Sequence, residues 1–421
     1  MIRKTIADYP LAMIALLLTA FGIAVVYSAG QTDVPSAAVQ AAWLRQLTWL
    51  GLGLTAFMVT TRLSVRFFEW AALPAYLLAI GLLVVTLVFG SGGGTAKSMS
   101  GWLTIGGVRL GQPSELAKIA VALMLAKVLA SYRVTPKSLV DLIKPAIVVL
   151  IPWLLVMKQP DLGTGLVFIG LFFAMLFWAG VSGTLLLLAA SPVISLVLAG
   201  STGLWITWFI VLCVAIWIYK PFVAEAVVLI VANLTMGVAA PIIWTQVLKE
   251  HQRERLLVFL DPARDPKASG YQMAQSKIAI GSGGWTGKGY TQGSQKRLAF
   301  LPEQHTDFIF AVVGEELGFL GVAAALTLFL FLFLRVIRVA TRATDSFSSL
   351  VAFGLAGSWF VHVIINVGMT INLMPITGIP LPFFSYGGSF LLACWIAVGI
   401  LVRISAEGRG RAGEMPIEFA R

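Results

Sequence analysis

The stretch FLPEQHTDFIFAVVGEELGFLG, residues 300–321, brings carboxylates and a histidine to the start of a long apolar segment. Residues 308–334 are apolar apart from Glu315 and Glu316, and a helix of that length can cross a bilayer. The stretch therefore predicts a membrane helix with Asp307 at its mouth. The two glutamates would lie about 12 Å deeper, at 1.5 Å of rise per residue.

These acidic residues have both a structural and a functional interpretation. Thr306 is a candidate N-cap, and Asp307 in the first turn would then serve only the helix dipole. Carboxylates at the depth of Glu315 and Glu316 are costly unless they face a cavity or a partner. Pairing with a lysine would make them purely structural, and the sequence leaves these interpretations open.

The composition excludes an ordinary soluble domain. The 421 residues are 58% hydrophobic and 12% charged, with a mean hydropathy of +0.90. We therefore expect an all-α, polytopic helical membrane protein. The net charge of +11 fits basic cytoplasmic loops better than nucleic-acid binding. Cys213 and Cys394 lie in apolar segments and indicate neither a disulfide framework nor a metal site.

Twelve apolar runs are candidate spans. They cover residues 11–29, 46–61, 69–90, 114–131, 140–157, 162–180, 183–200, 203–219, 222–246, 307–334, 348–370 and 383–402. Lys and Arg gather at alternate connections, which predicts that both termini are cytoplasmic. The long connection 247–305 then becomes a large extracytoplasmic loop. Its glycine-rich centre permits tight turns or a close approach to a ligand, or is simply a solvated loop.

Four polar, turn-rich segments fall on the same predicted side as Asp307. They lie at 91–113 (which runs into QPSELAKIA, 112–120), 158–165, 249–305 and 372–389. Prolines rule out a continuous helix in the last of them. We interpret them as one shared cavity, although Glu115 and Lys118 on one helix face could equally neutralise each other. The candidate cavity residues are Arg109, Glu115, Lys118, Asp161, Lys277, His305, Glu316 and Ser385.

Several of these segments also look familiar as motifs. QPSELAKIA, QPDLGTG, SGYQMAQSKIAIGSGGWTGKG, FLPEQHTDFIFAVVGEELG and GIPLPFFSYGGS occur in this order. The chain thereby resembles the SEDS family (shape, elongation, division and sporulation), and in particular its RodA, or elongation, branch. The family pattern has ten spans, so residues 181–245 would hold about two extra ones within a single integral membrane domain, 1–421.

The resemblance implies a peptidoglycan glycosyltransferase of the bacterial cytoplasmic (inner) membrane that polymerises lipid II. Asp307 matches the family's essential aspartate. The matches to its other polar cavity positions are Arg109, Glu115, Lys118, Asp161, Lys277 and Glu316. The resemblance also implies a class B penicillin-binding protein and other elongation-complex proteins as partners, and a divalent cation, Mg²⁺ or Mn²⁺, with unknown ligands.

The reaction explains why such residue types are needed. A sugar hydroxyl is a weak nucleophile, so a carboxylate such as Asp307 should take its proton as general base. Inversion at the anomeric carbon requires no covalent nucleophile, and the departing diphosphate requires positive charge. Many spans and buried carboxylates also describe a flippase or an ion-coupled transporter. A non-catalytic scaffold of the cell-wall machinery is a third possibility, for which Asp307 would be dispensable.

Overall fold

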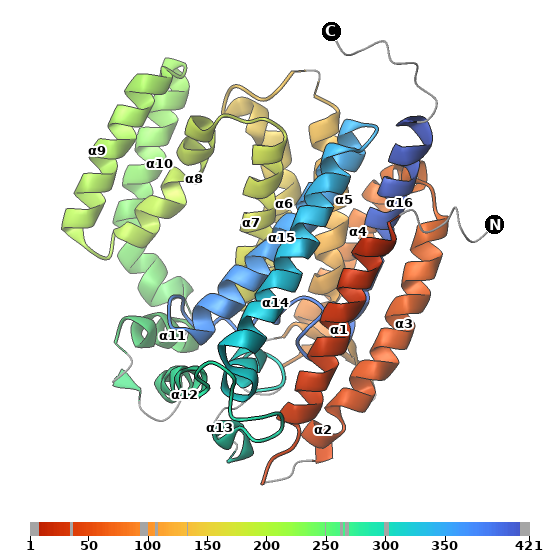
Figure 1. Cartoon of the computed structure of the whole chain (residues 1–421). Coiled ribbons are helices and arrows are strands. Elements are labelled where there is room, and N and C mark those ends of the chain that lie inside the picture. The colour runs from red at the N-terminus through yellow and green to blue at the C-terminus, as the bar shows by residue number, and fades with distance from the viewer. Residues whose placement is uncertain are drawn as a thin grey trace.

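The structure, a computed structural model, is an almost entirely helical bundle (Figure 1). It describes residues 8–33, 37–92, 100–105, 108–132, 134–248, 250–261, 264–265, 269–298 and 303–412. Within them, each of the twelve predicted runs corresponds to one long helix. These are α1 (Tyr9–Ala29), α3 (Ala42–Arg62), α4 (Val65–Phe89), α5 (Pro113–Ala130), α6 (Ile143–Lys158), α7 (Leu162–Trp178), α8 (Gly183–Leu198), α9 (Thr202–Tyr219), α10 (Val223–Ile242), α14 (Ile309–Thr341), α15 (Ser346–Thr370) and α16 (Gly388–Ala412).

Eight of these helices are long and apolar enough to cross a membrane: α1, α4, α6 with the preceding 3-10 turn η2 (Val140–Leu142), α9, α10, α14, α15 and α16. Helices α7 and α8 are apolar but shorter. The prediction of a polytopic helical membrane protein is confirmed, whereas the number of spans stays a prediction.

Helices α5, α15 and α16 form the buried centre of the bundle. Helix α15 packs against α5, α7 and α14, and α16 packs along α3. Small residues allow close approach. A Cβ atom on Gly357 would lie 2.7 Å from the Cβ of Ala174 on α7. Small residues at helix contacts are the usual means of association where lipid removes the hydrophobic driving force.

Residues 181–245, predicted to hold the extra spans, form α8, α9 and α10, which stand to one side of the bundle (Figure 1). A buried polar cluster joins the three helices. Asn233 of α10 donates to Ser191 Oγ at 2.8 Å and accepts from Ser195 Oγ at 2.6 Å, while Trp208 Nε1 of α9 donates to Ser195 Oγ at 3.1 Å. Whether this unit is an insertion stays a prediction.

Helix α14 is interrupted, which the sequence did not predict. Gly318 has φ +61° and ψ −158°, so the helical hydrogen bonding breaks there. The glycine-rich segment 284–289 repairs the break. The amides of Lys288 and Gly289 donate to the carbonyls of Glu315 and Glu316, both at 3.0 Å. Irregular backbone inside a membrane protein requires such protein partners.

On the other flank of the break, the amide of Phe319 donates to the carbonyl of Gly284 at 2.9 Å, and that of Leu320 to the carbonyl of Trp285 at 3.1 Å. The same loop therefore satisfies both sides of the interruption. Its glycines serve close approach to α14, whereas the sequence interpretation had them approach a ligand or form a solvated loop.

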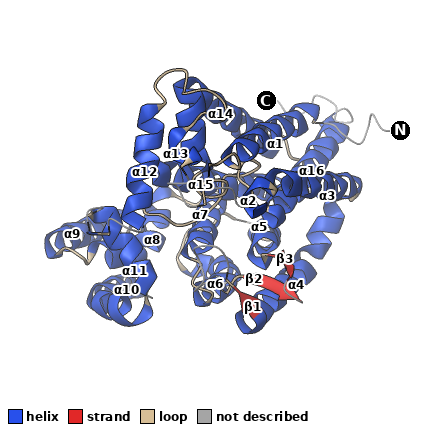
Figure 2. Ribbon diagram, turned by 90° about the horizontal axis from the view of Figure 1, so that it is seen from below, coloured by secondary structure: helices blue, strands red, loops and turns tan. Residues whose placement is uncertain are grey.

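Within the connection 247–305, the described residues form three helices, α11 (Glu250–Leu260), α12 (Ser269–Ser282) and α13 (Ser294–Arg297). The π-helix η3 (Ile243–Val247) precedes them. A short helix, α2 (Ala37–Gln40), joins α1 to α3. Between α4 and α5 lies an antiparallel sheet (Figure 2). Its strands are β1 (Gly90–Ser91), β2 (Trp102–Ile105) and β3 (Val108–Gly111), a local departure from an all-α chain.

The first and last described parts of the chain meet at one end of the bundle. Asp8 accepts from Arg335 Nε at 2.7 Å and from Ser405 Oγ at 3.0 Å. This arrangement agrees with an even number of crossings, while the side of the membrane on which the termini lie stays a prediction.

Candidate active site

The candidate site lies around Asp307, which ends the turn before α14. The predicted cap is wrong: Phe308 is the N-cap residue, and the Thr306 hydroxyl bonds to the carbonyl of Glu303 at 3.1 Å. Asp307 therefore lies just before the helix and not in its first turn. Its carbonyl accepts from Asn366 Nδ2 of α15 at 2.9 Å, and the same amide group donates to the carbonyl of Ile379 at 2.7 Å.

The loop between α15 and α16 closes over Asp307. Gly378 has a positive φ of +75°, and its backbone passes beside the Asp307 carboxylate. The neighbouring Thr377 carbonyl accepts from Arg255 Nη1 of α11 at 3.4 Å. Three segments that are distant in sequence, α11, the turn before α14 and this loop, thus converge on one carboxylate.

Arg255 is the cation that the structure brings to this site. Burial lowers the pKa of its guanidinium, and the charges of Asp307 and Asp161 oppose that effect. Arg255 thus lies within electrostatic reach of both carboxylates. Sequence reasoning missed it because it belongs to the charged run EHQRERLL, 250–257, where nothing local distinguishes one arginine from another.

Asp161 occupies the turn between α6 and α7 and is the N-cap residue of α7. Its carboxylate accepts from the Thr164 amide at 2.9 Å and from Thr164 Oγ1 at 2.7 Å. Gln112 Nε2, just before α5, donates to the same carboxylate at 3.0 Å. Burial raises the pKa of Asp161, while the Thr164 hydrogen bonds and the charges of Lys118 and Arg255 lower it.

Lys118 of α5 is a buried cation of the same cluster. The predicted pair on one helix face is present: Lys118 Nζ lies 2.7 Å from Glu115 Oε2, and both side chains are buried. Lys118 Nζ also lies 2.8 Å from His362 Nε2 of α15 and 4.9 Å from the centre of the Phe390 ring. Helix α5 begins just before this pair, with Gln112 as its N-cap residue and Pro113 in its first position.

The electrostatics of Asp307 are those of a proton acceptor near neutral pH. Burial raises the pKa of Asp307 to about 7, the negative charge of Glu303 adds to the rise, and Arg255 opposes it. General bases work best when their pKa lies near the operating pH. A strongly shifted carboxylate beside a specific charge partner is also a recognised indicator of a functional site.

Glu316, a predicted cavity residue, is instead part of a buried ion pair with Lys296 of α13. Ser28 of α1 bonds to both partners: Lys296 Nζ donates to its Oγ at 2.6 Å, and that hydroxyl donates to Glu316 Oε2 at 2.5 Å. Glu315 pairs with Lys288 at 2.8 Å. The structural interpretation of both glutamates, pairing with lysine, therefore matches the structure.

His305 and Ser385 lie beside the site and shape its loop. The His305 carbonyl accepts from the Tyr386 amide at 3.0 Å, and burial lowers the pKa of the His305 imidazole. Ser385 Oγ accepts from the Leu381 amide at 2.9 Å, and the Ser385 carbonyl accepts from Gln46 Nε2 at 3.0 Å. These contacts indicate that Ser385 fixes the chain before α16.

Two further predicted cations are not seen at the cluster. Lys277 lies exposed on α12. Arg109 belongs to β3, paired with Thr104, but its side chain lies outside the described residues. The structure therefore joins Asp307, Asp161, Glu115 and Lys118 of the predicted set. It adds Arg255, Gln112, His362 and Asn366, whose placement depends on tertiary packing.

Comparison with known proteins supports this chain-wide picture. The family of cell cycle proteins that comprises FtsW, RodA and SpoVE matches residues 9–208 and 184–410. The chain is 36% identical to the peptidoglycan glycosyltransferase MrdB of Escherichia coli K12 over 95% of its length and 94% of that protein. It is 34% identical to the peptidoglycan glycosyltransferase RodA of Treponema pallidum, over 95% and 98%.

Solved structures give the same result. A chain of a peptidoglycan synthase complex, described as coordinating polymerization and crosslinking, superposes with a TM-score of 0.71 at 28% identity, covering 95% of this chain and 98% of that one. The crystal structure of Thermus thermophilus RodA gives 0.60 at 26% identity, covering 94% and 96%. The predicted resemblance is thereby confirmed, and the chain belongs to the family of FtsW, RodA and SpoVE.

Proposed function

We propose that this protein is a peptidoglycan glycosyltransferase that polymerises lipid II into glycan strands during cell elongation. Its relatives MrdB and RodA carry that enzyme name and align along 95% of the chain. The observation that carries the proposal is the site itself: Asp307, with a pKa of about 7, lies within electrostatic reach of the half-buried cation Arg255 where helices of the bundle end.

In the proposed reaction, the 4-hydroxyl of a GlcNAc unit attacks the anomeric carbon of a second lipid-linked chain. Asp307 takes the hydroxyl proton as the new C–O bond forms. The bond between the anomeric carbon and the diphosphate breaks, and undecaprenyl diphosphate leaves with that electron pair. One displacement inverts the anomeric centre. General-base assistance contributes about 10²–10⁴ in rate.

Arg255 is positioned to stabilise the charge that develops on the departing diphosphate. Its side chain is half-buried, within electrostatic reach of Asp307 and Asp161, and its Nη1 donates to the Thr377 carbonyl, so the guanidinium is held at the site before substrate binds. Preorganised charge in a site of low dielectric is usually the largest electrostatic contribution to such reactions. Lys118 contacts Glu115 and His362 and lies within electrostatic reach of Asp161. This supports a role for Lys118 in positioning the Asp161 carboxylate at the start of α7.

We also propose a divalent cation, Mg²⁺ or Mn²⁺, that binds with the substrate. Among the described residues there is no group of three or more His, Cys, Asp or Glu side chains that could hold a metal ion. Such a cation would take most of its oxygen ligands from the diphosphate and from water, as Mg²⁺ commonly does. The cation would supply charge neutralisation for the leaving group.

The partner proposed for this chain is a class B penicillin-binding protein, together with other proteins of the elongation complex. A structural relative belongs to a peptidoglycan synthase complex, which supports this assignment. We place the protein in the bacterial cytoplasmic membrane with Asp307 on the extracytoplasmic side. The alternation of Lys and Arg between connections supports that orientation.

The test is polymerisation of fluorescent lipid II by purified protein with its transpeptidase partner and Mn²⁺. Asp307→Asn is expected to lower the rate at least about 100-fold, because the amide cannot accept the proton. Asp33→Asn is the matched control, since Asp33 is exposed and pairs only with Arg297 among the described residues. Unchanged polymerisation by Asp307→Asn would refute the base assignment.

The thermostability of Asp307→Asn relative to the wild type checks that the variant folds. Because burial raises the pKa of Asp307, the native state favours the neutral carboxyl, and this contribution to stability is lost as pH rises through about 7. Asp307→Asn should therefore be at least as thermostable as the wild type at pH 8.

A wild type that forms no glycan but translocates lipid II would favour the flippase alternative instead.

A further inference from the structure

A cavity lined by both polar and apolar residues lies far from Asp307, where α8–α10 meet the main bundle. Its volume is about 510 Å³, within the range of small-ligand pockets. Three connections line it: 135–138 before α6, 180–182 between α7 and α8, and 219–225 between α9 and α10. Helix α7 begins beside Asp161 and ends beside this cavity, so its 17 residues separate the two sites by about 25 Å.

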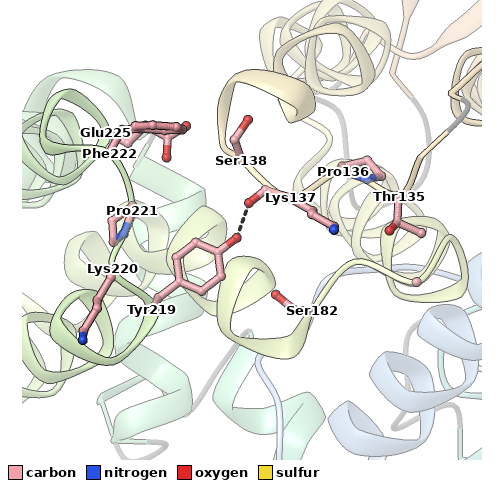
Figure 3. Close-up of a pocket in the computed structure, with 11 residues that line it drawn as sticks. Thr135, Pro136, Lys137, Ser138, Ser182, Tyr219, Lys220, Pro221, Phe222 and Glu225 are labelled. Carbon is pink, nitrogen blue, oxygen red and sulfur yellow. Dashed lines mark hydrogen bonds between the residues drawn. The ribbon is translucent and has the colours of Figure 1, made fainter.

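The cavity carries two lysines without partners. Lys137 and Lys220 are both exposed, and within the part of the chain that the structure describes, neither ammonium group has an ion-pair or hydrogen-bond partner. Figure 3 shows the Lys137 side chain pointing toward the space between Ser182 and Thr135, whereas the Lys220 side chain points away from the other lining residues. A long, unpartnered side chain at the rim can turn over the opening.

The carboxylate in the cavity does not neutralise these lysines. Glu225 is 8% exposed and accepts the Leu139 amide at 3.1 Å, which ties α10 to the start of α6. The Tyr219 hydroxyl is likewise committed, since it donates to the Lys137 carbonyl (Figure 3). The residues that line the opening therefore carry one net positive charge, with the Asp141 carboxylate behind them, bonded to the backbone amides of Lys137 and Ser138 at 3.0 and 3.1 Å.

The surroundings are those of a membrane surface. Phe222 and Val223, beside the opening, are 78% and 81% exposed, and Trp217 on the last turn of α9 is 74% exposed. Most of α9 and α10 is apolar and faces outward. Acyl chains could lie along these helices while a headgroup occupies the cavity beside Lys137 and Ser138. Basic pockets between membrane helices are a recognised setting for anionic lipid headgroups.

We propose that this cavity binds the phosphate of an anionic phospholipid headgroup, held by Lys137 and Lys220, at the membrane face opposite Asp307. The lipid would join α8–α10 to the connection before α6, the junction that the cavity occupies. This site is separate from the one that binds lipid II in the proposed reaction, and the inference does not depend on that activity.

The test is titration of the purified protein with dioleoylphosphatidylglycerol or dioleoylphosphatidylcholine, with bound lipid counted by native mass spectrometry. Lys137→Gln and Lys220→Gly are each expected to weaken binding of the anionic lipid about 5-fold, and the pair about 30-fold. Lys220 has φ +51° and ψ 56°, where glycine is favoured, so Lys220→Gly removes the charge without backbone strain. Binding of the phosphatidylcholine should not change.

Lys144→Gln is the matched control, because Lys144 is exposed on the first turn of α6 but does not line the cavity. It should change binding of the anionic lipid less than 2-fold. An equal loss in Lys144→Gln would overturn the proposal in favour of general surface charge. Competition by soluble sn-glycerol 3-phosphate at equal concentration would overturn it in favour of a site for free phosphate compounds.

Discussion

The backbone of Gly378 lies directly against the carboxylate of Asp307. A Cβ atom built on Gly378 would lie 3.2 Å from Asp307 Oδ2 and 4.0 Å from Arg255 Nη1. The φ of +75° at this position is also one that residues with a side chain rarely adopt. Glycine at 378 therefore allows the loop before α16 to close over the carboxylate and the guanidinium together.

We predict that Gly378→Ala lowers kcat/KM for lipid II polymerisation about 10- to 100-fold, because small displacements of reacting groups have effects of that size. The methyl group would press on Asp307 Oδ2, and the left-handed backbone would add about 1–2 kcal/mol of strain. Gly281→Ala on α12 is the control, since a Cβ atom there meets nothing within 4 Å. Equal activity of both variants would show that the close approach has no catalytic consequence.

The charges around Asp307 predict two opposite shifts of the pH–rate profile. A base with a pKa of about 7 gives a rate that rises with pH through neutrality. Glu303 raises this pKa, so Glu303→Gln should move the acidic limb to lower pH. Arg255 lowers it, so Arg255→Gln should move the limb to higher pH.

The measurement is kcat/KM for polymerisation from pH 5.5 to 9, at saturating Mn²⁺. Loss of Arg255 should also lower the rate at every pH, because the diphosphate loses a cation, but the position of the limb is a separate readout. Shifts of both variants in the same direction would mean that the limb does not report Asp307. A profile without an acidic limb would remove Asp307 from the role of base.

The helices could be predicted because a bilayer imposes their length and hydrophobicity on the sequence. The break at Gly318 could not, because a single glycine is tolerated within a helix and the break depends on hydrogen bonds from a loop about thirty residues earlier. The ion pair of Glu316 could not be predicted either, because its lysine partner lies twenty residues away in sequence, on α13.

The contacts of the candidate site also divide into those that local sequence predicts and those that depend on tertiary packing. The cap at Asp161 and the pair Glu115–Lys118 are local, three residues apart or fewer, so helix geometry alone predicts them. Arg255 reaches Asp307 only through the packing of α11, and Lys277, an equally plausible cation by sequence, faces outward on α12. Which basic residue serves the site is thus decided by tertiary structure.

Two neighbouring cations of α13 should differ sharply in their contribution to stability. The Lys296 side chain is fully buried against Glu316 and Ser28, whereas the Arg297 side chain is 52% exposed and pairs with the half-exposed Asp33. Lys296→Met leaves the Glu316 charge buried without its partner. Breaking a buried pair in this way costs about 3–5 kcal/mol, whereas an exposed pair contributes about 0–1 kcal/mol.

We therefore expect Lys296→Met to lower the free energy of unfolding by several kcal/mol and Arg297→Met by less than about 1 kcal/mol, measured by detergent denaturation of the purified protein. The double variant Lys296→Met with Glu316→Gln should recover much of the loss, because no unpaired charge remains buried. Recovery in the double variant would identify desolvated charge as the cause. A double variant as unstable as Lys296→Met would show instead that the packing of Lys296 against α1 and α14 matters more than its charge.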